Sequence, residues 1–314
     1  MTTKLTWVLA HEPYDLFLRA AEKFSQEVNQ KTNGAFEIEI LGIQEYAEKY
    51  NNGVAVDNRT GLLDLLENGS IQLSQMYTTT LGQRSQDMFV LDLPFLFEGH
   101  DHAARVLDGE IGQQLFDTLS KESKIQGLAF TYSGGFRIVP SAEPIGKLED
   151  LAGMRVRVPA SPVARDTFEA IGAIPVEMPI EALSQGLAEK SVDAGESTYP
   201  RIYSMNQAQH SKSIAHTEHS LFLTSLIMNK DLWDSFDAET QQIFNQAALA
   251  AAQVERQESI QDIAKTQARA ESDGITVTRL SERDTAEFKA ATADLHDKYD
   301  GIFTKGLIGR IKTA

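Results

Sequence analysis

Arg157 is the side chain best placed in this sequence to bind a small anion. It lies in residues 153–159, where alternating apolar and charged residues predict a short strand. Pro159 cannot donate to a sheet ladder, so the strand should end there and leave Arg157 near its carboxyl end. Ligands bind at that end in open α/β sheets, and a guanidinium can hold a carboxylate through two parallel hydrogen bonds. The spacing alone also allows an ordinary surface arginine.

Two further loops follow predicted strands and carry polar side chains. His11 and Glu12 stand between the first strand and the first helix. Glu12 could accept hydrogen bonds from hydroxyl groups or pair with an ammonium, and it could equally serve the helix N-terminus electrostatically. Tyr77 and Thr78 follow another strand. Their hydroxyls could line a ligand cleft, or they could belong to a plain polar loop.

Metal and catalytic sites have little support in the sequence. His216, Glu218 and His219 suggest a metal site, as do His100 and His102, but neither set has a third ligand at fixed spacing. We therefore expect no metal and no cofactor. A Gly-x-Ser-x-Gly nucleophile elbow is absent, no carboxylate pair stands out at a strand end, and no glycine run has phosphate-loop spacing. We expect a protein that is not an enzyme.

Composition limits the class of protein. The 314 residues are enough for two domains, and 42% hydrophobic with 24% charged residues is typical of a globular protein. The net charge of −16 argues against nucleic acid and anionic membranes as partners. The absence of cysteine excludes disulfides, thiolate nucleophiles and cysteine zinc sites. No apolar run approaches the roughly 20 residues that span a bilayer, and no signal peptide is evident.

Strand-like and helix-like segments alternate, which predicts an α/β fold. Gly134 and Gly135 predict a turn or hinge, and residues 42–61 read as a long surface loop or insertion. Apolar periodicity predicts strands near 5–9, 36–40, 71–77 and 125–131, and helices over 17–28 and 62–66.

A long helix is the clearest architectural signal. Asp237 can cap a helix that meets no glycine or proline before Gly274. At 1.5 Å per residue it would be on the order of 55 Å long, more than the width of one small domain. We therefore predict that the helix, over about 237–273, spans two discontinuous domains. These are residues 1–132 plus 222–258 and residues 133–221 plus 259–314.

Many short motifs, in this order and spacing, resemble the substrate-binding proteins of tripartite ATP-independent periplasmic (TRAP) transporters, the DctP-type solute-binding family. The resemblance covers most of the chain apart from residues 42–61 and the last dozen residues. The motifs are Leu91-Asp92-Leu93-Pro94-Phe95-Leu96-Phe97, Val106-Leu107-Asp108-Gly109, Gly135-Phe136-Arg137, the Arg157 strand, Gly172-Ala173-Ile174-Pro175-Val176, Val192-Asp193-Ala194-Gly195-Glu196 and Met228-Asn229-Lys230-Asp231-Leu232-Trp233.

The resemblance implies a periplasmic-binding-protein-like fold of two α/β domains that close around a ligand in a cleft. It implies that Arg157 forms a bidentate salt bridge with the ligand carboxylate and that Arg137 assists. Phe136, next to Arg137, is the candidate ligand-facing aromatic residue. The resemblance implies that the loop with His11 and Glu12 contacts the end of the ligand that is remote from the carboxylate.

The segment after Val192-Asp193 departs from the family pattern. Where the family commonly has an asparagine after Glu196, this chain has Ser197, whose hydroxyl reaches less far and offers one donor rather than two. Thr198 or Tyr199 could supply the missing contact.

The resemblance implies a periplasmic solute-binding protein of a TRAP transporter that captures a sugar acid, hydroxy acid or dicarboxylate. Its partners would be that ligand and the membrane components of the transporter. We expect a monomer in the periplasm, with its signal peptide removed. The alternative function is a small-molecule enzyme or a ligand sensor on a similar two-domain scaffold.

Overall fold

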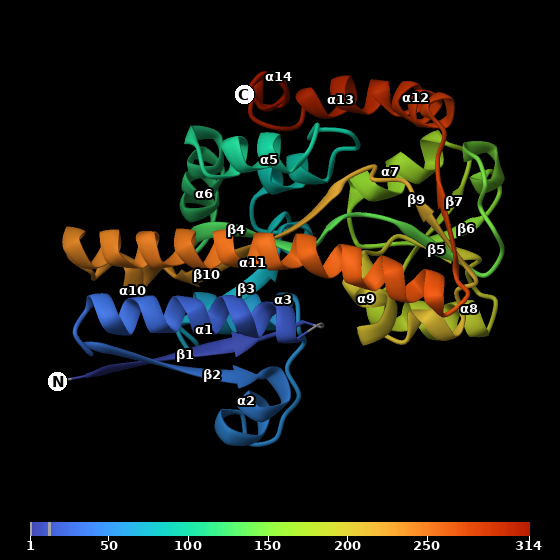
Figure 1. Ribbon diagram of the computed structural model, residues 1–314. Helices are drawn as coiled ribbons and strands as arrows, with labels where there is room; N and C mark the ends of the chain where they lie inside the picture. The colour runs from blue at the N-terminus through green and yellow to red at the C-terminus, as the bar shows by residue number, and fades with distance from the viewer. Residues whose placement is uncertain (1, 12–13) are drawn as a thin grey trace. The chain divides into compact units, whose positions relative to one another are not determined.

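The computed structural model describes residues 2–11 and 14–314, and the chain forms two compact units (Figure 1). The first unit comprises residues 1–88, 104–132 and 223–258, and the second comprises 89–103, 133–222 and 259–314. Residues 89–103 and Phe222, which the predicted boundaries assign to the first domain, belong here to the second unit.

A five-stranded sheet of order β2-β1-β3-β10-β4 organises the first unit. β1 pairs in parallel with β2 and β3, while β10 runs antiparallel to β3. The strands are β1 Thr3–Leu9, β2 Phe36–Gly42, β3 Leu73–Tyr77, β4 Ile125–Phe136 and β10 Leu221–Asn229. The ends of β4 and β10 continue into the second unit.

Helices of the first unit pack their apolar residues into its core. In α1 (Tyr14–Lys31), the predicted apolar stripe that includes Phe17 and Phe24 is buried. The Phe24 ring packs edge-on against Trp7 and Phe244, with centroids 5.4 and 5.6 Å away. The other helices of this unit are α2 Ile43–Tyr50, α3 Thr60–Glu67, α4 Thr78–Leu81, α6 Glu110–Glu122 and α10 Lys230–Asp234.

A six-stranded mixed sheet of order β11-β9-β5-β8-β6-β7 organises the second unit. β6 lies between β7 and β8 and is parallel to both, while β5 is antiparallel to β8 and β9. The strands are β5 Val139–Ser141, β6 Arg155–Val158, β7 Ile174–Glu177, β8 Ala194–Gly195, β9 Ser213–His216 and β11 Thr276–Arg279.

Buried apolar residues of β6, including Val156 and Val158, form a core with Phe168 of α7 and Phe288 of α12. The α-helices of this unit are α7 Pro162–Ala170, α8 Leu183–Ala188, α9 Tyr199–Ser204, α12 Glu282–Ala291, α13 Ala293–Asp300 and α14 Leu307–Lys312. The 3-10 helices η2 Leu148–Leu151, η3 Ile180–Ala182 and η4 Gln207–Gln209 also lie here. Helix α5 His100–Leu107 and the 3-10 helix η1 Gln86–Asp92 have residues in both units.

The predicted long helix is confirmed as α11, Ala238–Ser272, which contributes residues 238–258 to the first unit and 259–272 to the second. Its buried residues in the first unit include Phe244, Ala247 and Ala251, while Ala270 is buried in the second. Two apolar stripes on one uninterrupted helix therefore serve two cores.

Two local predictions were wrong. Residues 42–61 are not simply a surface loop, because Ile43–Tyr50 forms α2 with Tyr46 and Ala47 buried. Gly134 and Gly135 do not form the predicted turn but lie inside β4, with positive φ angles of 91° and 77°; the alternative of a hinge stays a prediction. A Cβ at Gly134 would lie 2.5 Å from Thr198 Oγ1, so close packing explains that glycine.

Within the described part of the chain, no helix has both the length and the apolar character needed to cross a membrane.

Candidate functional site

The side chain of Arg157 is buried in the second unit and oriented by backbone carbonyl groups. On β6 the residue pairs with Val176 of β7 and Gly195 of β8. Its Nε donates to the carbonyl of Met178 at 2.8 Å and its Nη1 donates to the carbonyl of Glu196 at 3.1 Å. These two hydrogen bonds, both to backbone carbonyl groups, fix the plane of the guanidinium.

Arg155, two residues earlier on the same strand, has a different environment. It donates two hydrogen bonds to the carboxylate of Asp193, at 2.6 and 3.0 Å, and both side chains are partly exposed. These hydrogen bonds lower the pKa of Asp193 below its ordinary value. The charge of Arg155 is thus already matched by an acid, which makes it a natural control for Arg157.

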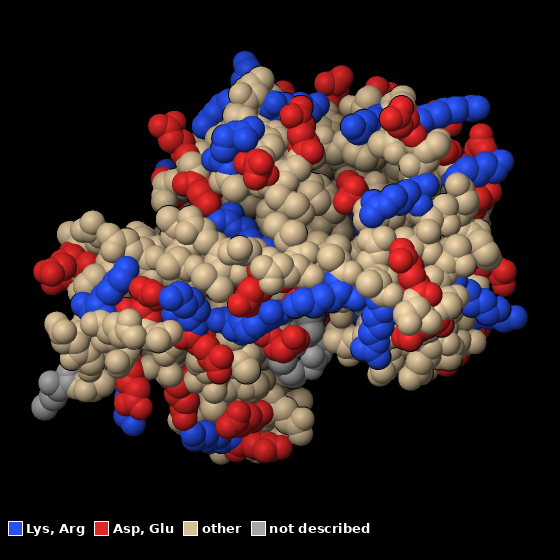
Figure 2. Space-filling model, in the orientation of Figure 1, with Lys and Arg blue, Asp and Glu red and all other residues tan. Residues whose placement is uncertain are grey.

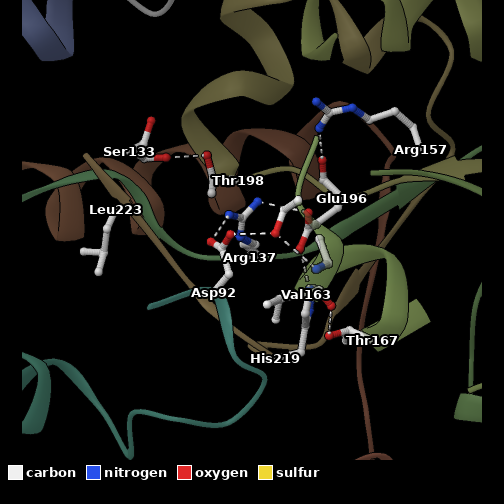
Figure 3. Close-up of polar contacts among 12 residues, drawn as sticks. Asp92, Ser133, Arg137, Arg157, Val163, Thr167, Glu196, Thr198, His219 and Leu223 are labelled. Carbon is white, nitrogen blue, oxygen red and sulfur yellow. Dashed lines mark hydrogen bonds and ion pairs between the residues drawn. The ribbon is translucent and has the colours of Figure 1, made fainter. Parts of the chain in front are cut away.

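Arg137 lies at the centre of a buried ion-pair network (Figure 3). Its Nη1 donates to Glu196 Oε2 at 3.0 Å and its Nη2 donates to Asp92 Oδ1 at 3.2 Å. His219 Nε2 lies 3.0 Å from Glu196 Oε1, and Ser161 Oγ donates to Asp92 Oδ2 at 2.8 Å. The network connects Arg137 to Arg157, because the backbone carbonyl of the same Glu196 accepts from Arg157.

The two acids of this network respond differently to burial. Burial raises the pKa of Asp92 to about 6, although Arg137 opposes the rise. Burial also acts to raise the pKa of Glu196, but Arg137 and His219 outweigh it and hold that pKa below its ordinary value. Glu196 therefore carries the negative charge that balances Arg137.

The structure places the predicted aromatic residue, Phe136, away from the Arg137 network. Its half-buried ring packs edge-on against His100, with the ring centroids 5.1 Å apart, and it lines a cavity of the second unit. The ring against Arg137 is that of Phe222, whose centroid lies 3.8 Å from the guanidinium carbon. The ligand contact predicted for Phe136 stays a prediction.

The hydroxyl groups of residues 197–199 are buried and engaged within the second unit. Ser197 Oγ donates to Gln207 Oε1 at 2.8 Å, and Thr198 Oγ1 donates to the carbonyl of Ser133 at 2.9 Å. The Tyr199 hydroxyl lies 2.8 Å from His216 Nδ1. A ligand contact from any of these side chains would replace or share one of these bonds, and the predicted contacts remain untested.

Three of the four candidates from the first unit lie within the described residues; Glu12 lies outside them. The buried His11 ring has its centroid 4.0 Å from that of Tyr77, and its Nε2 lies 3.2 Å from the sulfur of Met76. Thr78 begins α4, and its hydroxyl donates to the carbonyl of Leu223 at 3.2 Å. The structure thus brings His11 and Tyr77 together at the ends of β1 and β3.

The histidines of the possible metal sites have separate partners. His216 faces Glu218 at 3.0 Å, whereas His219 turns to Glu196 and to Thr217 Oγ1, which lies 2.8 Å from its Nδ1. His102 is held by the amide of Glu98 and the carbonyl of Ile311. Among residues 2–11 and 14–314, no three or more histidine, aspartate or glutamate side chains form a group that could hold a metal ion.

Sequence reasoning missed Asp92, Ser161 and Phe222 as members of the arginine network. Asp92 stands in a leucine-rich motif, where one acid among apolar residues is the kind of signal that marks a buried, paired charge. No comparable signal identifies Phe222, because an aromatic residue in a strand is normally part of the core.

The chain was compared with known families, proteins and structures. The family described as "Bacterial extracellular solute-binding protein, family 7" (DctP) matches residues 10–301. A C4-dicarboxylate-binding protein of Bacillus subtilis is 28% identical over 296 residues, covering 92% of this chain and 80% of the relative.

Solved structures agree with this match. A TRAP periplasmic solute-binding protein from Xanthobacter autotrophicus with bound β-D-galacturonate has a TM-score of 0.85 and 27% identity, covering 99% of both chains. One from a Polaromonas species bound to D-erythronate has a TM-score of 0.86 and 25% identity, covering 99% of this chain and 98% of that one. The chain belongs to the DctP family of TRAP solute-binding proteins.

Proposed function

We propose that this member of the TRAP solute-binding family captures an organic acid by forming a salt bridge between the ligand carboxylate and Arg157. One observation carries the proposal: a buried guanidinium oriented by two neutral carbonyl groups, those of Met178 and Glu196. A planar, permanently charged fork whose orientation is already fixed loses little entropy when it binds a carboxylate in two-point fashion.

Arg137 supports the site from behind in this proposal. It holds the side chain of Glu196, and the carbonyl of Glu196 holds Arg157. Because Arg137 already contacts two carboxylates at 3.0 and 3.2 Å, we propose that it positions Arg157 rather than supplying a second full salt bridge to the ligand. The family resemblance implies that Arg137 assists in binding the ligand, and we propose that it does so indirectly, by positioning Arg157.

We propose a hydroxylated monocarboxylate, such as a sugar acid, as the ligand class. The hydroxyl-rich residues 78–80 follow β3, and two related structures hold D-erythronate and β-D-galacturonate. A C4-dicarboxylate is the second candidate, favoured by the relative from Bacillus subtilis that binds this class.

Other parts of the account are also proposals. We propose that the mature protein works as a monomer in the periplasm after loss of a signal peptide, and that it delivers its ligand to the membrane components of a TRAP transporter. The two predicted domains would close over the ligand, as the family resemblance implies.

A panel of organic acids tests the proposed function. Thermal unfolding should shift upwards with one or a few sugar acids, because a ligand that binds only the folded state stabilises it. Arg157→Ala should lose the shift and Arg155→Ala should keep it. Mass spectrometry of the same mixtures should show every acid unchanged, whereas reproducible conversion of an acid would favour the enzyme alternative.

A further inference from the structure

A cavity of the second unit is separate from the network of Arg137 and Arg157. It has a volume of about 680 Å³. Its lining comes from residues 94–100, Phe136, residues 216–218, residues 279–296 and Lys312. Figure 2 shows a hollow on this face below α12 and α13. Pockets for small organic molecules have volumes of roughly 300–1,000 Å³, so this cavity has the size of a ligand site.

Three basic side chains, Arg279, Lys289 and Lys312, line this cavity. All three residues are exposed. The whole chain carries a net charge of −16, so a cavity lined by three cations differs locally from the charge of the molecule.

Two acids also line the cavity, and the structure assigns one of them to a histidine. Glu218 Oε1 lies 3.0 Å from His216 Nε2, and this contact, with a smaller contribution from Arg279, lowers the pKa of Glu218. Glu98 is the other acid. The lining therefore holds three cations against two carboxylates, one of which lies 3.0 Å from a histidine ring nitrogen.

Apolar and aromatic side chains form part of the wall between these charges, beside histidine and threonine side chains. Phe95, Phe97, Phe136 and Leu280 contribute to the lining. The Lys289 ammonium lies 5.4 Å from the centroid of the Phe95 ring, a cation–π distance that keeps this charge at the aromatic wall. A site of this kind suits a molecule with an apolar body and an anionic group.

Backbone strain is a second, independent mark of this cavity. Phe95 and Glu218 both have left-handed conformations, with φ of 53° and 48°. This is uncommon for any residue with a side chain and especially for a bulky aromatic one. Hydrogen bonds hold both residues: the Phe95 amide donates to the carbonyl of His219 at 2.7 Å, and the Glu218 amide donates to that of Arg137 at 3.1 Å. Such conformations persist only where surrounding contacts hold them, and they cluster at functional sites.

We propose that this cavity is a second binding site of the protein, for an organic anion with an apolar or aromatic body. The anionic group would lie among Arg279, Lys289 and Lys312, and the apolar body would lie against Phe95 and Phe136. The site is distinct from Arg157 and does not depend on the function proposed for that residue.

Fluorine NMR with 4-(trifluoromethyl)benzoate as the probe tests this proposal. The full chain should give saturable broadening of the probe signal, and the same dissociation constant should hold in Arg157→Ala. The double variant Arg279→Gln/Lys289→Gln should bind about tenfold more weakly, since two charges contribute to the anion site. Lys305→Gln, an exposed lysine outside the cavity, should bind like the unaltered chain.

The neutral probe 4-(trifluoromethyl)benzyl alcohol, of similar shape, should bind at least tenfold more weakly than the carboxylate. Absence of saturable binding would overturn the proposal, and so would equal affinity of the double variant. Loss of probe binding in Arg157→Ala would also contradict it, because the probe would then occupy the other site. Equal melting temperatures of all variants would show that weaker binding does not come from unfolding.

Discussion

At the scale of single residues, the hydrogen-bond acceptors decide what each arginine does. Arg157 donates to two backbone carbonyl groups, whereas Arg155 and Arg137 donate to carboxylates. Exposure separates these last two, because Arg155 is partly in solvent while Arg137 is fully buried. Three arginines of one unit thus have three different environments, and we propose the ligand-binding role for Arg157 alone.

Arg137→Met should destabilise the protein strongly. The substitution leaves Asp92 and Glu196 buried without their cation, and breaking a buried ion pair on one side costs about 3–5 kcal/mol. The exposed pair of Arg155 predicts a loss below about 1 kcal/mol for Arg155→Met. Urea unfolding of both variants measures the difference, and equal small losses would contradict the supporting role of Arg137.

Glu255 predicts a specific dependence of stability on pH. This buried side chain accepts a hydrogen bond from the Tyr132 amide at 2.8 Å, and burial raises its pKa from an ordinary 4.5 to about 8. Between these values the folded state holds a proton that the unfolded state releases. The contribution of Glu255 to the free energy of unfolding is therefore fully present below about pH 4.5 and is lost as the pH rises to about 8.

Glu255→Gln should remove this loss, because the amide is neutral at every pH and its oxygen can still accept from Tyr132. Melting temperatures at pH 5 and pH 8.5 should differ less in the variant than in the unaltered chain. Glu122→Gln, at an exposed position, serves as the control. An unchanged pH dependence in Glu255→Gln would show that this carboxyl does not titrate as described.

Sequence reasoning reached Arg157 but not the contacts that orient it. Alternation and Pro159 were enough to predict the strand, which is confirmed as β6. Asp92, Arg137, Glu196 and His219 are up to 127 residues apart in the chain, and only the folded sheet brings them together. Side-chain networks of this kind have no local spacing pattern, so they could not be predicted from periodicity.

At the scale of elements, Gly134 fixes how β4 meets α9. It has a φ of 91°, and an added Cβ would meet Thr198 Oγ1 at 2.5 Å and Pro200 Cδ at 2.8 Å. Gly134→Ala should destabilise the protein by about 1–3 kcal/mol from backbone strain, and by more from the collision.

Gly309→Ala is the matched control for this prediction. Gly309 lies in α14 and an added methyl group would meet nothing within 4 Å, so alanine should be neutral or stabilising there. Thermal unfolding compares the two variants. A Gly134→Ala protein as stable as the unaltered chain would show that β4 adapts without strain.

Periodicity predicted the long helices and several short strands but missed the short helix α2. The apolar stripe of α1 and the uninterrupted span of α11 are confirmed. The helix α2 has only eight residues, and its polar composition concealed the buried pair Tyr46 and Ala47. In the Gly134-Gly135 segment, glycine was read as a break in the strand, whereas tertiary packing keeps the strand continuous.

At the scale of the whole molecule, charge opposes the proposed ligand. The net charge of −16 repels an organic anion at long range, while the attraction of Arg157 acts only locally. Salt screens the long-range field with a Debye length of about 10 Å at 0.1 M. The association rate of the acid should therefore rise severalfold as NaCl increases.

Stopped-flow fluorescence with the acid selected by thermal screening measures this rate. Tetramethylammonium chloride at the same ionic strength should have the same effect, which excludes a specific role of sodium. A rate that falls as salt is added would mean that local cations, rather than the net charge, dominate the approach of the ligand.

The overall α/β architecture and the family were predictable because many weak motifs agree in order and spacing, and the family match over residues 10–301 confirms both. The ligand was not predictable in the same way. The family resemblance implies an asparagine where this chain has Ser197, whose hydroxyl donates to Gln207 Oε1. The identity of the acid depends on such individual exchanges and not on the shared fold.

Isothermal titration calorimetry of the selected acid against Arg157→Ala tests the central claim most directly, with Arg155→Ala as the matched control. Removing one partner of a buried ion pair at a binding site costs about 2–5 kcal/mol. Arg157→Ala should therefore lose about 30-fold or more in affinity, while Arg155→Ala keeps the affinity of the unaltered chain. Full affinity in a folded Arg157→Ala protein would contradict the claim that this guanidinium holds the carboxylate.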